Sequence, residues 1–108
     1  MNENITNVRA LVKEFLPNIC LRLDDMHDKY KTKNEFDNDR VIFLIDDLSS
    51  LMEGIGIIKE HYPKLDVYEF NEKVNLLVEA FEAKDYPLFF DIILYELKPL
   101  LEYWNENI

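Results

Sequence analysis

The chain has 108 residues, of which 48% are hydrophobic, so it is long enough for one domain with a buried core. It contains two glycines and one cysteine, which argues against a disordered or loop-rich β protein and excludes an intramolecular disulfide and a cysteine-based zinc site. Its formal net charge of −10 argues against nucleic-acid binding, which needs clustered positive charge. We therefore expect a single acidic domain over residues 1–108.

The first predicted helix spans residues 5–30. Apolar residues recur there at intervals of three and four, as on one face of an amphipathic helix. Pro17 lies inside this segment and the pattern continues past it, so we interpret Pro17 as a kink and not as a helix end. The polar stretch 31–39 ends the helix, and Asp37 or Asn38 is the predicted N-cap of the next one.

The second predicted helix spans residues 41–62 and stops before Pro63, which cannot continue it. Gly54 and Gly56 interrupt its sequence, and each glycine is unfavourable by about 1 kcal/mol relative to alanine inside a helix. These two glycines therefore indicate either a close crossing with another helix or a local bend.

The third predicted helix spans residues 67–81, with Asp66 and Glu69 resembling a capping box at its start. A short link leads to the last predicted helix. Strand-like alternation of apolar and polar residues is not sustained anywhere in the chain.

The last predicted helix spans residues 86–104. Asp85 is placed to cap it, and Pro87 falls in its first turn, where a proline is tolerated. Pro99 lies inside the helical pattern and is interpreted as a second kink. Because short links favour antiparallel neighbours, we predict an all-α fold, an up-down-up-down four-helix bundle with kinks at Pro17 and Pro99.

The last helix is apolar over more of its circumference than a bundle requires. Beside its core face runs a second apolar line formed by Leu88, Ile92, Pro99 and Tyr103. Unless the first helix covers them, these residues form an exposed apolar patch of the kind that usually marks an interface. We therefore predict that they bind a protein partner or a second copy of the chain. Ile42 and Ile57 form a smaller surplus on the second helix.

The alternative prediction is a metal-binding or enzymatic bundle that uses His27, His61 and nearby carboxylates. Di-metal bundles need two Glu-x-x-His pairs, and the nearest spacing here is Asp24 with His27, once. The carboxylates around His27 are more simply interpreted as a solvated helix end. We therefore predict no enzymatic activity, no cofactor and no metal.

Two further polar features are candidate catalytic groups. Cys20 has apolar neighbours and is interpreted as a small buried hydrophobe. Asp46 and Asp47, together with Glu96 of the last helix, offer a carboxylate pair, but we interpret them as polar residues at the rim of the core.

The stretches "NLLVEAFEAKD" and "DIILYELKPLLEYWNE" resemble the C-terminal half of the flagellin-type export chaperones. That resemblance implies an acidic helical bundle that holds an aggregation-prone helical client. The chain also looks like one of the small uncharacterised acidic helical families of Gram-positive bacteria. The first residues are neither basic nor followed by an apolar run, so we expect no signal peptide, a cytoplasmic location and no membrane partner.

Overall fold

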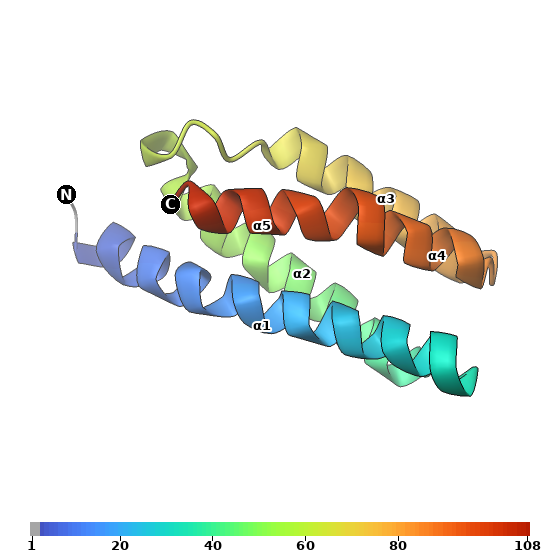
Figure 1. Ribbon diagram of the computed structural model, residues 1–108. Coiled ribbons are helices and arrows are strands. Elements are labelled where there is room, and N and C mark those ends of the chain that lie inside the picture. The colour runs from blue at the N-terminus through green and yellow to red at the C-terminus, as the bar shows by residue number, and fades with distance from the viewer. Residues whose placement is uncertain (1–2) are drawn as a thin grey trace.

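The computed structural model describes residues 3–108, and all regular secondary structure within this range is helical (Figure 1). The predicted all-helical bundle is therefore confirmed. The last helix consists of three consecutive parts that follow one another without a break. The elements in chain order are α1 (Glu3–Lys33), α2 (Asn38–Ile58), the 3-10 turn η1 (Lys59–His61), α3 (Val67–Glu82), α4 (Tyr86–Ile92), the π-helical segment η2 (Ile93–Leu97) and α5 (Lys98–Glu106).

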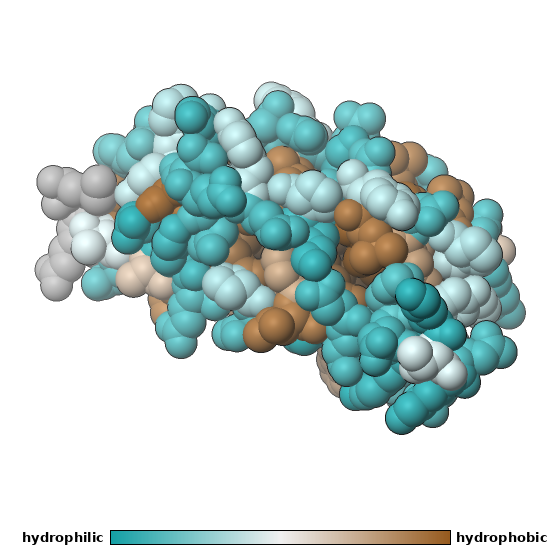
Figure 2. Space-filling view, viewed as in Figure 1, coloured by the Kyte–Doolittle hydropathy of each residue, from teal (hydrophilic) through white to brown (hydrophobic). Residues whose placement is uncertain are grey.

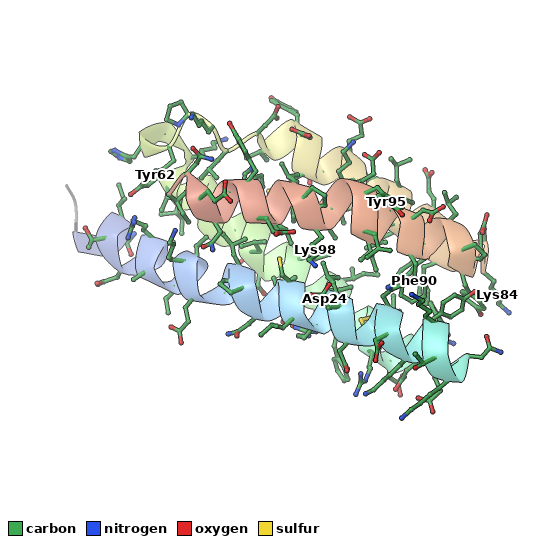
Figure 3. All side chains as sticks on the ribbon, viewed as in Figure 1. Asp24, Tyr62, Lys84, Phe90, Tyr95 and Lys98 are labelled. Carbon is green, nitrogen blue, oxygen red and sulfur yellow. The ribbon has the colours of Figure 1, made fainter. Side chains whose placement is uncertain are left out.

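Contacts between distant residues show how α1 and the last helix lie together. The guanidinium group of Arg9 donates to the main-chain carbonyl of Ile108. Further along α1, Oδ1 of Asp24 lies 2.6 Å from Nζ of Lys98, between α1 and α5 (Figure 3). Residue numbers rise along α1 as they fall along α5, so these two helices are antiparallel neighbours.

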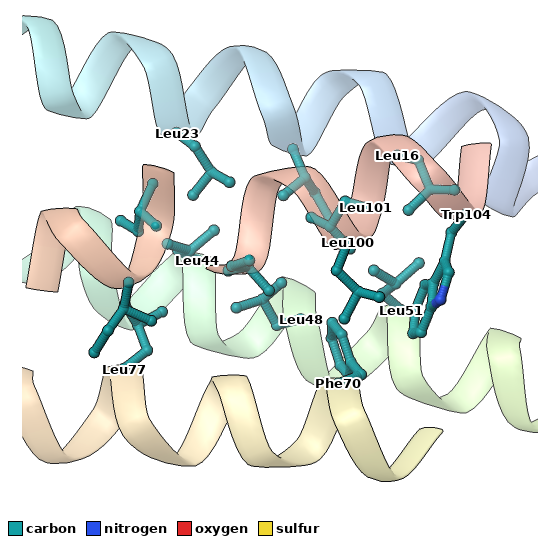
Figure 4. Close-up of a cluster of buried hydrophobic side chains, with 14 of the residues drawn as sticks. Leu16, Leu23, Leu44, Leu48, Leu51, Phe70, Leu77, Leu100, Leu101 and Trp104 are labelled. Atoms are coloured by element: carbon teal, nitrogen blue, oxygen red, sulfur yellow. The ribbon is translucent and has the colours of Figure 1, made fainter. Parts of the chain in front are cut away.

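One hydrophobic core fills the space between the helices (Figure 4). The apolar line predicted for α2 is completely buried, from Val41 to Ile58. Leu16 is also fully buried, although it was outside the predicted apolar line of α1. The buried stripe of α1 is therefore shifted from Phe15 toward Leu16, and α1 contacts both α2 and α5. The largest fully buried side chains on the other helices include Phe70, Leu77, Phe89 and Trp104.

Aspartates cap the starts of three helices, as the sequence predicted for two of them and gave as one of two alternatives for α2. The carboxylates of Asp37, Asp66 and Asp85 accept hydrogen bonds from main-chain N–H groups in the first turns of α2, α3 and α4. Asn34 and Lys84, both with φ of 55°, follow the ends of α1 and α3 in the left-handed conformation that often terminates helices. Local signals therefore set most of the helix boundaries.

Both internal prolines lie within helices that continue past them. Pro17 lies inside α1, and Pro99 lies in the first turn of α5. Directly before Pro99 the helix widens into η2, where the N–H of Lys98 donates to the carbonyl of Ile93, five residues earlier. Pro99 has no N–H to donate to the carbonyl of Tyr95, and its ring crowds that carbonyl, so a wider turn is favoured there. The sequence did not predict this π-helical segment, and the bends at the two prolines stay predictions.

Candidate protein-binding site

The fold separates the four residues of the predicted apolar surface on the last helix. Leu88 and Tyr103 are 46% and 45% exposed, and Pro99 is also exposed. Ile92 is only 6% exposed, so it does not belong to the exposed part of this surface. The physical reason is that α4 packs mainly against α3, whereas the sequence had suggested only α1 as a cover.

Two of the remaining residues line one groove. Pro99 and Tyr103 lie with Tyr95 in a groove between the last helix and the segment that leads into α3. The walls of this groove are mixed in character, because an ion pair between Lys73 and Glu96 joins α3 to η2 there. The surface predicted from the sequence is therefore only partly apolar.

The face shown in Figure 2 is mostly hydrophilic, and hydrophobic residues interrupt it in the band between α1 and the last helix. A shallow groove in this band is lined by Pro17 and Leu21 from α1 and by residues of α5. The ion pair between Asp24 and Lys98 lies in the same groove. The apolar residues of this band are therefore interspersed with charged ones.

A largely apolar groove lies between α1 and α2, and we call it the α1–α2 groove. It has a volume of about 560 Å³. Leu11 of α1 is 65% exposed and Ile57 of α2 is 47% exposed, and both line it. Its other apolar lining residues are Val8, Val12, Phe15 and Leu51. The outward position of Ile57 was noted from the sequence, but Leu11 was missed.

The sequence of the first helix does indicate on which side of the helix Leu11 lies. Leu11 and Phe15 are four residues apart, so they lie on the same side of α1. Phe15 belonged to the predicted core line, but it is only partly buried. Leu11 adds an exposed residue to this apolar side. Only the fold shows that residues of α2, among them Ile57, lie on the other side of the groove.

Gly54 explains why α1 and α2 approach closely beside this groove. A Cβ atom at Gly54 would lie 3.0 Å from Cγ2 of Val12 and 3.8 Å from Cγ1 of Val8. The predicted close crossing is therefore present at Gly54. A Cβ atom at Gly56 would meet nothing within 4 Å, so Gly56 has no such role.

The charged residues that line the α1–α2 groove are acidic. Glu14 and Glu53 line it and are exposed, and neither forms an ion pair with another residue in the described range 3–108. The basic groups of this half of α1 are directed elsewhere, because Arg9 and Lys13 donate to main-chain carbonyls near the end of the chain. The result is an apolar floor with two unpaired carboxylates.

The two histidines of the alternative prediction are not brought together. The ring of His27 lies 5.5 Å from the ring of Phe90. Arg40 at the start of α2 pairs with Asp25 at 2.8 Å, which places His27 near that end of α2. His61 lies beyond the other end, in η1, and the 21 residues of α2 span about 30 Å. Within residues 3–108, no group of three His, Cys, Asp or Glu side chains is placed to hold a metal ion.

The carboxylates around His27 are exposed, as expected for a solvated helix end, and two of them, Asp24 and Asp25, also form ion pairs. Asp24 pairs with Lys98, and the hydrogen bond to Asp24 raises the pKa of Lys98. Asp25 pairs with Arg40 and with Lys29, and the hydrogen bond from Arg40 is the main reason that the pKa of Asp25 is lowered. These carboxylates therefore link helices or support α1 itself.

The other candidate catalytic groups include Asp47 and Glu96, which form ion pairs, and Cys20, which is partly buried. Asp47 pairs with Arg22 of α1, and Glu96 pairs with Lys73 of α3, so the two carboxylates are engaged by different helices. Cys20 is half-buried, and burial raises the pKa of its thiol to about 11. At neutral pH the thiol is protonated and a poor nucleophile.

None of the helices within residues 3–108 combines the length and the apolar content that crossing a membrane requires.

A family model with the description "Domain of unknown function (DUF8042)" matches residues 9–107. This match covers nearly the whole chain, and the chain therefore belongs to the DUF8042 family. The prediction that the chain belongs to an uncharacterised family is therefore confirmed. No curated protein and no solved structure matched the chain in the corresponding comparisons.

Proposed function

We propose that this member of a family without a known function is a non-catalytic module that binds a protein partner in the α1–α2 groove. The observation that carries the proposal is the exposure of Leu11 and Ile57 on facing helices of one apolar groove. Exposed apolar surface that gathers in one place usually marks an interaction site, whereas scattered exposed apolar residues need no explanation.

Several more detailed predictions from the sequence are kept as part of this proposal. We propose that the helices follow the up-down-up-down order, with bends at Pro17 and Pro99. A cytoplasmic module that holds a helical client, as the resemblance to the flagellin-type export chaperones implies, is one use of such a groove. Leu88, Pro99 and Tyr103 are exposed and are proposed to provide a second, smaller contact surface.

Site-specific photo-crosslinking in cells that make the protein tests the proposal. A photoreactive amino acid replaces Leu11 in one variant, Ile57 in a second, and Tyr68 in a control. Tyr68 is 87% exposed and lies on α3, outside the groove. We expect discrete protein adducts from the two groove positions and none of the same mass from the control position.

A change on the opposite wall makes the test specific. In the chain with the photoreactive group at position 11, Ile57→Asp should abolish the adducts, because a carboxylate on the facing wall disfavours an apolar occupant. Ile57 is exposed, so this variant should remain folded, which circular dichroism verifies. Equal adducts from all three positions, or adducts unaffected by Ile57→Asp, would overturn the proposal.

A further inference from the structure

We infer that the occupant of the α1–α2 groove is an amphipathic helix of a partner protein whose apolar face is flanked by lysine or arginine. This inference rests on the proposed function and specifies the chemistry of the partner. It is argued from the shape of the groove and from its charge.

The shape of the groove suits a helix. The groove follows α1 from Val8 to Asn18, which corresponds to about 15 Å, or nearly three helical turns. A helix that lies along such a groove buries residues spaced at i, i+3 or i+4 and i+7. The exposed side chains of Leu11 and Ile57 offer contacts to those residues from both walls.

The charge of the groove favours a partner helix with basic residues beside its apolar face. Glu14 on the α1 wall and Glu53 on the α2 wall both line the groove, and no basic side chain of the described residues 3–108 does. An apolar helix with lysine or arginine beside its apolar face would place positive charge next to both carboxylates. Such an arrangement favours encounter with the correct partner and disfavours acidic ones.

Charge also argues against a second copy of the chain as the occupant. Each copy carries a formal net charge of −10 and would bring further carboxylates to the interface. Self-association through this groove would therefore work against electrostatic repulsion.

Two synthetic helical peptides of about 18 residues, roughly 27 Å long as helices, test the inference. Both carry the same leucine face, but one has lysine flanks and the other glutamate flanks. We expect the lysine peptide to bind roughly tenfold more tightly, as two surface ion pairs allow. This difference in affinity should largely disappear when the salt concentration is raised from about 0.01 M to about 1 M. Amide shift changes in NMR spectra should centre on Leu11, Phe15 and Ile57.

Matched variants separate the groove from the general acidity of the protein. Glu14→Gln together with Glu53→Gln should remove most of the preference for the lysine peptide. Glu79→Gln together with Glu82→Gln changes the net charge equally but alters exposed residues of α3. This control should leave the preference nearly intact.

Each remaining outcome overturns the inference in a recognisable way. If both double variants lost the preference for the lysine peptide equally, the attraction would be a non-specific effect of the acidic protein. Equal binding of the two peptides would show that the flanks do not matter. Dimers in light scattering that Leu11→Asp dissociates would show that the occupant is a second copy. Peptide failure combined with groove-specific crosslinking would reject the basic helix alone, whereas loss of the crosslinks would reject the proposed function itself.

Discussion

Gly54 and Val12 are so close that a Cβ atom on the glycine would lie 3.0 Å from Cγ2 of the valine. This contact joins α2 to α1 at the edge of the α1–α2 groove. The absence of a side chain at one residue therefore decides how closely these two helices approach. The neighbouring Gly56 provides a matched comparison, because a Cβ atom there would meet open space.

Substitution of the two glycines by alanine should have different effects. Gly56→Ala should increase the free energy of unfolding by about 1 kcal/mol, because alanine favours the helix and has room. Gly54→Ala gains the same helix preference but pushes against Val12, so it should be less stable than Gly56→Ala by about 1 kcal/mol or more. Urea unfolding of both variants checks this difference. Equal stabilisation would show that Val12 moves aside easily.

Two leucines of α1 should respond differently to truncation. Leu16 is fully buried and Leu11 is 65% exposed. Leu16→Ala should lower the free energy of unfolding by about 2–5 kcal/mol, whereas Leu11→Ala should change it by no more than about 0.5 kcal/mol. Denaturant unfolding measures both values. A large loss for Leu11→Ala would mean that this side chain is covered and that the groove is not open.

The single tryptophan lies fully buried beside Phe70, with the ring centroids 5.1 Å apart. Its Nε1 atom is buried and has no hydrogen-bond partner among residues 3–108. Trp104→Ala should lower the free energy of unfolding by about 3–5 kcal/mol. Trp104→Phe should lower it by about half as much or less, because phenylalanine keeps an aromatic ring and removes the unpaired N–H group.

Thermal and urea unfolding followed by circular dichroism measure both tryptophan variants, since the fluorescent group is lost. An equal effect of phenylalanine and alanine would contradict this expectation.

Alkylation of Cys20 should be slow in the folded protein. Burial is the main cause of the rise in the pKa of its thiol from 9.0 to about 11, and the negative charge of Glu102 adds to it. The thiolate is the reactive form, so at about pH 8 iodoacetamide should react roughly a hundredfold more slowly than with the urea-unfolded chain. The rate in the folded protein should still be rising at about pH 10, and a plateau near pH 9 would contradict the shift.

Helices and their ends follow from interactions between residues close in sequence, and these were predictable. The spacing of apolar residues predicted α2 and its buried line from Val41 to Ile58, and the aspartates at 37, 66 and 85 predicted helix starts. A cap requires only a side chain and the main chain of the next turn. The close crossing at one of the glycines was predicted as one of two alternatives.

The binding surface depends on which helix covers which side, and only the tertiary structure decided that. The sequence left open whether the line of Ile92 and Tyr103 is exposed or covered by the first helix. In the fold α4 packs against α3, and Ile92 is buried whereas Tyr103 reaches the surface. Leu11 and Ile57 are 46 residues apart in the chain, and no local pattern connects them. They face one groove because Gly54 lets α2 approach α1, and such long-range packing has no signature within a single helix.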